Sequence, residues 1–133
     1  MKNKGVQMIA IPLDTKESTV ISKLYGNSAY FALLNEETGS FKVVKNEGCG
    51  DGIDTARFVS EKNIDSTIFY YMGEKVYDYL EEKGLKVYSS LKTHLSIDEI
   101  YQSLLSAKCT EVTKENSSTF LDSGNSACTC KAK

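Results

Sequence analysis

The sequence lacks the features of several functional classes. With a single histidine, His94, it offers neither a Ser-His-Asp triad nor a Cys-His pair, so we expect no enzymatic activity. The formal net charge is only -2 and the basic residues are scattered, which argues against binding to nucleic acid, where clustered Lys and Arg supply most of the affinity. No apolar run approaches the ~20 residues of a membrane-spanning helix. We therefore expect a cytoplasmic protein with neither nucleic acid nor membrane as a partner.

The four cysteines argue for thiol or metal chemistry. In a reducing compartment they are expected to be free thiols or metal ligands, because disulfides are rare there. Cys128 and Cys130 form a C-x-C pair near the C-terminus, which differs from the paired C-x2-C spacing of structural zinc sites. Two interpretations of this pair stay open: a mobile arm that captures a soft metal or a cluster, and an unstructured end whose cysteines are incidental.

The pattern of apolar residues predicts one α/β domain. Apolar and β-branched runs predict strands at 6–13, 29–36, 40–47, 66–72 and 85–90, of which 66–72 is expected to be central. Helical spacing predicts helices near 52–63, 74–83 and 97–107, the last one opened by a capping box of Ser96 and Glu99. This order predicts a mixed five-stranded sheet with flanking helices over residues 1–107. Residues 108–133 are rich in Ser, Thr and Lys and are expected to form a flexible tail.

The stretch "GCGDG" at 48–52 concentrates glycine around one thiol, just ahead of a predicted helix. Glycines allow a close approach to a bound group, and the amides at a helix N-terminus favour anions and stabilise a thiolate at Cys49. A thiolate ligates soft metals such as iron and molybdenum. Two other interpretations remain: a turn whose cysteine is a small filler, and a cradle for phosphate, although the spacing is not that of a P-loop.

Four segments, in order and spacing, resemble the dinitrogenase iron–molybdenum cofactor biosynthesis family of NifX and NafY type. They are "IAIPLD" at 9–14, "YGNSAYFALLN" at 25–35, "GCGDGID" at 48–54 and "GLKVY" at 84–88. The resemblance implies a ribonuclease-H-like three-layer sandwich that binds and carries iron–sulfur or molybdenum-containing cofactors. It also implies a donor or acceptor metalloprotein as partner. Where family members often carry a histidine, this chain has Leu24, so that ligand is missing.

The combined hypothesis is a non-enzymatic carrier of a metal–sulfur cofactor. The alternatives are an anion- or phosphate-binding module built on the glycine-rich loop, and a metal-dependent ribonuclease-H-like hydrolase that would use Asp14, Asp51 and Asp54. The residues expected to bind the cofactor are Gly48, Cys49, Gly50, Gly52, Asn27 and Ser28, and those expected to ligate metal are Cys49, Cys128, Cys130 and His94.

Overall fold

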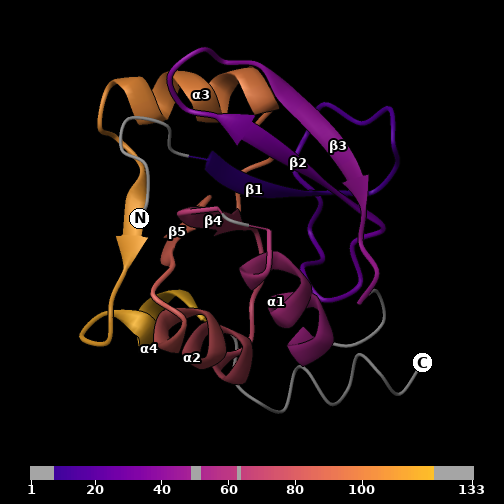
Figure 1. Ribbon diagram of the computed structural model, residues 1–133. Helices are drawn as coiled ribbons and strands as arrows, with labels where there is room; N and C mark the ends of the chain where they lie inside the picture. Colours follow the sequence, from indigo (N-terminus) through magenta and orange to yellow (C-terminus); the bar gives the residue numbers. More distant parts are fainter. Residues whose placement is uncertain (1–7, 49–51, 63, 122–133) are drawn as a thin grey trace.

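The computed structural model describes residues 8–48, 52–62 and 64–121 (Figure 1). The strands are β1 (Met8–Leu13), β2 (Tyr30–Asn35), β3 (Phe41–Lys45), β4 (Ser66–Phe69), β5 (Lys86–Ser89) and β6 (Thr110–Val112). The helices are α1 (Gly52–Ser60), α2 (Glu74–Glu82), α3 (Ile97–Leu105) and the single turn α4 (Ser117–Phe120). No helix in these ranges is long and apolar enough to cross a membrane.

The strands form one mixed sheet in the order β3-β2-β1-β4-β5-β6. β4 is parallel to its neighbours β1 and β5, whereas the other pairs are antiparallel. Every residue of β4 is buried, which confirms the prediction of a central strand covered on both faces. The α/β class is therefore confirmed and the count of five strands is wrong, because β6 adds a sixth. The ribonuclease-H-like assignment stays a prediction.

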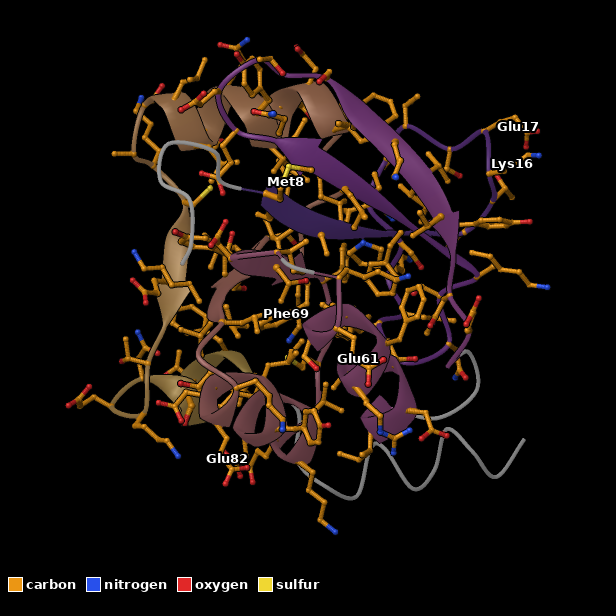
Figure 2. The ribbon with its side chains drawn as sticks, in the orientation of Figure 1. Met8, Lys16, Glu17, Glu61, Phe69 and Glu82 are labelled. Atoms are coloured by element: carbon orange, nitrogen blue, oxygen red, sulfur yellow. The ribbon has the colours of Figure 1, made fainter. Side chains whose placement is uncertain are left out.

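Helices cover both faces of the sheet (Figure 1). α3 packs on one face, where Ile100 contacts a cluster that includes Ile9 and Ile11. α1, α2 and α4 lie on the opposite face, where Leu80 belongs to a second cluster that contains Phe69. Figure 2 shows Phe69 in the interior between the sheet and these helices. The two clusters make the apolar layers above and below the sheet.

The ends of the helices follow the chemistry expected from the sequence. At the start of α3, Ser96 Oγ accepts a hydrogen bond from the Glu99 amide at 3.0 Å, and Glu99 Oε1 accepts one from the Ser96 amide at 2.8 Å. This reciprocal pair confirms the predicted capping box. α2 ends just before Gly84, whose φ of 85° is a conformation that glycine adopts without strain.

Residues after Ala107 continue the folded unit rather than leaving it. β6 pairs with β5, and the side chains of Val112 and Leu121 join the core cluster on the α1 and α2 face. A three-residue strand that buries one side chain has no detectable period, so the composition alone suggested a tail. The predicted boundary at residue 107 thus falls between two elements of one packed unit. Residues 122–133 lie outside the described residues.

The topology collects four loops at one edge of the sheet. β1, β4 and β5 are parallel, and β3 runs the same way as β1 because both are antiparallel to β2. Their carboxyl ends therefore share one edge, the carboxyl edge, which carries residues 14–29, 46–48, 70–73 and 90–96. Ligands of open α/β sheets bind outside the carboxyl ends of the strands.

Candidate functional site

A buried hydrogen-bond network lies beneath the glycine turn at residues 46–52. Asn46 and Thr55 are almost fully buried. Asn46 Nδ2 donates to the carbonyl of Ser28 at 2.8 Å and to Thr55 Oγ1 at 3.0 Å. Thr55 Oγ1 lies 2.9 Å from the carbonyl oxygens of both Gly26 and Gly48. This Asn46–Thr55 network ties the loop before β2, the turn after β3 and helix α1 to one another.

The two described glycines of the turn are required by packing within the protein. A Cβ atom at Gly48 would lie 2.4 Å from the carbonyl carbon of Asp54, and one at Gly52 would lie 2.8 Å from Val76 Cγ2. Both distances are too short for a side chain, so these glycines allow close contact with α1 and α2 rather than with a ligand. The Gly48 amide also donates to Asn46 Oδ1 at 2.9 Å. The turn is therefore fixed at both of its ends.

Four other residues were predicted to bind the cofactor: two fall outside the described residues, and two lie in the loop before β2. Cys49 and Gly50 fall outside the described residues, as does Asp51. Ser28 is buried, and its hydroxyl donates to the carbonyl of Tyr25 at 2.9 Å. Asn27 is exposed in the same loop. The network therefore links the carbonyl group of Ser28 to Gly48 through Asn46. The Ser28 hydroxyl, in contrast, bonds within its own loop.

Tyr25 anchors this loop to the centre of the sheet. Its hydroxyl is 2.7 Å from Thr67 Oγ1, which donates to the carbonyl of Ala10 at 2.9 Å, so Tyr25 is the donor of the first bond. Burial raises the pKa of Tyr25 far above its ordinary value, which keeps the hydroxyl protonated. Sequence reasoning missed Tyr25, Asn46 and Thr55. The one signal was that polar residues flank the glycine turn on both sides.

His94 lies at a different part of the carboxyl edge. It is exposed after β5, and its ring centroid is 5.1 Å from that of Tyr70. Tyr70 packs on the face of the sheet covered by α3, whereas Gly48 and Gly52 contact α1 and α2, on the opposite face. The structure therefore does not bring His94 to the glycine turn. Within the described ranges, no group of three His, Cys, Asp or Glu side chains is arranged to hold a metal ion, and Cys128 and Cys130 fall outside these ranges.

The described carboxylates of the hydrolase hypothesis make separate local interactions. Asp14 accepts a hydrogen bond from the Ser22 hydroxyl at 2.6 Å. Asp54 forms an ion pair with Arg57 at 2.8 Å, and this neighbouring charge raises the pKa of Arg57. Two carboxylates that serve a loop and a helix turn do not converge on a common metal position. The described residues thus give the hydrolase hypothesis no ligand cluster.

Comparison with known families decides the assignment. The family model described as dinitrogenase iron–molybdenum cofactor matches residues 7–107, which span β1 to α3 and every loop of the carboxyl edge. The chain belongs to this family. The assignment confirms the resemblance seen in the four sequence segments.

Solved structures share the fold of this family member. The apo form of the orange protein from Desulfovibrio gigas has a TM-score of 0.71 at 20% identity, covering 84% of this chain and 97% of its own. An NMR structure of a candidate NifB protein from Thermotoga has a TM-score of 0.65 at 22% identity, covering 82% and 98%. A candidate dinitrogenase from Methanocaldococcus jannaschii has a TM-score of 0.64 at 15% identity, covering 83% and 98%. No curated protein matches the chain.

Proposed function

We propose that this protein binds and carries an iron–sulfur or molybdenum-containing metal–sulfur cofactor, which it exchanges with a donor or acceptor metalloprotein. The observation that carries the proposal is the position of the glycine turn in a member of the iron–molybdenum cofactor family. Gly48 follows β3 at the carboxyl edge and contacts α1, where the dipole at the helix N-terminus favours an anionic cargo.

The anchored ends of the turn support a role for the residues between them. The Asn46–Thr55 network and the contact of Gly48 with α1 fix the chain on either side of residues 49–51. A thiolate at Cys49 would be the soft ligand of the cargo, and the amides of Gly50 and Gly52 would donate to its sulfides, since the Gly48 amide already donates to Asn46. Cys128 and Cys130 would complete the thiolate shell from the C-terminal segment. His94 would contact the cargo only if the cargo reached across the sheet edge.

Cys109 provides a matched control for this chemistry. It is half-buried next to β6, at the opposite edge of the sheet from β3. Burial, and to a smaller extent the charge of Glu36, raises the pKa of the Cys109 thiol. A raised pKa leaves less of the thiolate that ligates metal. Cys109 should therefore contribute to packing and not to retention of the cargo.

The test is metal content per chain after identical anaerobic reconstitution of the wild type, Cys49→Ser, Cys109→Ser and the double variant of Cys128 and Cys130. We expect Cys49→Ser to keep its circular dichroism spectrum but lose most of its metal and visible absorbance, because a hydroxyl is a poor soft-metal ligand. Cys109→Ser should load like the wild type, and the double variant should fall between. Equal metal content in all four proteins would remove the cysteines from the mechanism.

The anion- or phosphate-binding alternative uses the same turn and differs in its cargo. It is favoured by the helix N-terminus that follows the turn, which binds phosphate as readily as an anionic cluster. Anaerobic purification separates the two functions. A coloured protein that contains iron or molybdenum supports the carrier, whereas a colourless protein that retains phosphate compounds supports the alternative.

A further inference from the structure

A second cluster of polar groups lies at the carboxyl ends of β4 and β5, on the face covered by α3. The Ser90 amide donates to the carbonyl of Phe69 at 2.9 Å, so the parallel pairing of the two strands continues one residue past β5. Side chains alternate between faces along a strand. Since Tyr88 and Tyr70 both pack on the α3 face, the side chain of Ser90 lies on that face, beside Tyr70.

The hydroxyl of Ser90 has no hydrogen-bond partner. The residue is 4% exposed, and its Oγ atom is the one buried side-chain nitrogen or oxygen in the described part of the chain that lacks a partner. Buried polar groups are nearly always hydrogen-bonded, and each exception requires an explanation. The neighbouring Ser89 differs, because its hydroxyl accepts from the Leu91 amide at 2.9 Å.

The turn that follows Ser90 is strained. The Thr93 amide donates to the carbonyl of Ser90 at 3.1 Å, and the two residues between them, Leu91 and Lys92, have φ angles of 59° and 55°. Two successive positive φ angles define a turn that normally contains Gly, Asn or Asp, and neither residue here is of that kind. Strained backbone of this type is concentrated at active sites and ligand-binding segments, where the surrounding structure holds it in place.

Two lysine side chains lie over the aromatic rings that follow β4, the strand next to Ser90. Lys23 Nζ lies 5.9 Å from the centroid of the Tyr70 ring, which also packs against the His94 ring at an interplanar angle of 42°. Lys92 Nζ lies 5.4 Å from the centroid of the Tyr71 ring, and the two tyrosine rings are in edge-to-face contact at 4.8 Å. Neither lysine forms a salt bridge with another residue in the described ranges. Their positive charge is therefore available to an anion.

We propose that Ser90, Lys23, Lys92, Tyr70 and His94 form a binding site for a small tetrahedral oxyanion, the Ser90 site. The two ammonium groups supply the attraction, and the hydroxyl of Ser90 supplies a donor that the folded protein otherwise leaves without a partner. Because the Ser90 oxygen is buried, this donor can reach the anion only if the turn at residues 90–93 opens on binding. This site goes beyond the proposed cofactor carrier, since it uses no thiol and lies on the α3 face of the sheet, whereas Gly48 and Gly52 contact α1 and α2 on the opposite face.

The test uses the full chain without reconstituted metal, titrated with phosphate, sulfate and molybdate at constant ionic strength. Amide chemical shifts of ¹⁵N-labelled protein report the location, and isothermal titration reports the affinity. We expect saturable shifts at residues 90–94 and 70–71. The double variant Lys23→Gln with Lys92→Gln should bind about tenfold or more weakly, because two charged partners are lost. Molybdate binding with no phosphate binding would identify the metal oxyanion as the source, and the reverse would identify phosphate.

Ser90→Ala gives a signature that a purely structural residue would not give. Removing a buried hydroxyl without a partner should raise the melting temperature, while binding weakens about tenfold. Lys62→Gln is the matched control, because Lys62 Nζ also lies over an aromatic ring, that of Phe58 at 4.7 Å, on the other side of the sheet. Shifts confined to residues 46–52, unchanged binding in Ser90→Ala, or equal losses in Lys62→Gln would overturn the proposal. Cys49→Ser should bind the oxyanion as the wild type does. The oxyanion site can therefore be confirmed even if the carrier hypothesis fails.

Discussion

Thr55→Val is the sharpest test of the Asn46–Thr55 network. Valine has nearly the shape of threonine and is equally β-branched, so the change deletes the hydroxyl while helix α1 and its packing stay the same. That hydroxyl accepts from Asn46 Nδ2 and lies within hydrogen-bond distance of the carbonyls of Gly26 and Gly48. The variant therefore removes the contact that joins three segments of the carboxyl edge.

The expected cost follows from the hydrogen bonds that are lost. A hydroxyl has one proton, so Thr55 donates one bond at a time and accepts another from Asn46. Each net bond contributes about 1 kcal/mol, and the buried carbonyl groups left with fewer partners add to the loss. The total is about 2–3 kcal/mol. Thr55→Ser keeps the hydroxyl and loses one buried methyl group, worth about 1 kcal/mol.

The assay is urea unfolding of the wild type and both variants, followed by circular dichroism and tyrosine fluorescence. We expect the midpoint to fall more for Thr55→Val than for Thr55→Ser, with the slope unchanged because the surface exposed on unfolding is the same. Metal loading after reconstitution should fall in the valine variant if the network positions the glycine turn. A valine variant as stable as the serine variant would refute the network's role in stability.

Three further predictions concern other parts of the chain. Gly48→Ala should destabilise the fold by about 3 kcal/mol, because the new Cβ would collide with the backbone of Asp54 in α1, which cannot move away. The midpoint of urea unfolding should fall accordingly. Burial raises the pKa of Glu36, so its ionisation costs stability as pH rises through the folded pKa. Glu36→Gln should then raise the free energy of unfolding at pH 7 by less than about 1 kcal/mol, with no gain near pH 3. A slightly higher melting temperature at pH 7 would show this. Deletion after Ala107 should lower the melting temperature sharply, since Val112 and Leu121 contribute about 1.5–3 kcal/mol each.

The sequence predicted well the elements whose signal is long or chemically specific. Strand β4 was recognisable because it begins a continuous β-branched and aromatic run, and all four of its residues are buried in the structure. Helix α3 was recognisable because Ser96 and Glu99 form a reciprocal cap and apolar residues repeat at helical spacing behind it. These signals are local, so one stretch of chain contains all the information that determines them.

The missed features depend on partners distant in sequence. β6 is a strand because β5 has a free edge beside it, and its own three residues carry too little pattern to show this. Asn46 and Thr55 look like ordinary turn and helix residues until folding buries them beneath Gly48 and Gly26. Glycines at 48 and 52 suggested an open cradle, but each is required by a contact with a helix that the sequence does not specify.

The separation of the two clusters at the carboxyl edge limits what one ligand can contact. A single metal ion has ligands within about 2–2.5 Å, so an ion is not expected to be shared by the described glycines of the turn, which contact α1 and α2, and His94, which lies beside Tyr70 on the opposite face of the sheet. The turn has amides and one thiol, which suit a cluster with several sulfides, whereas the Ser90 site has lysines and hydroxyl groups, which suit oxygen atoms. The two chemistries predict that Cys49→Ser and Ser90→Ala affect different ligands. If both variants lost both ligands equally, the carboxyl edge would act as one continuous site.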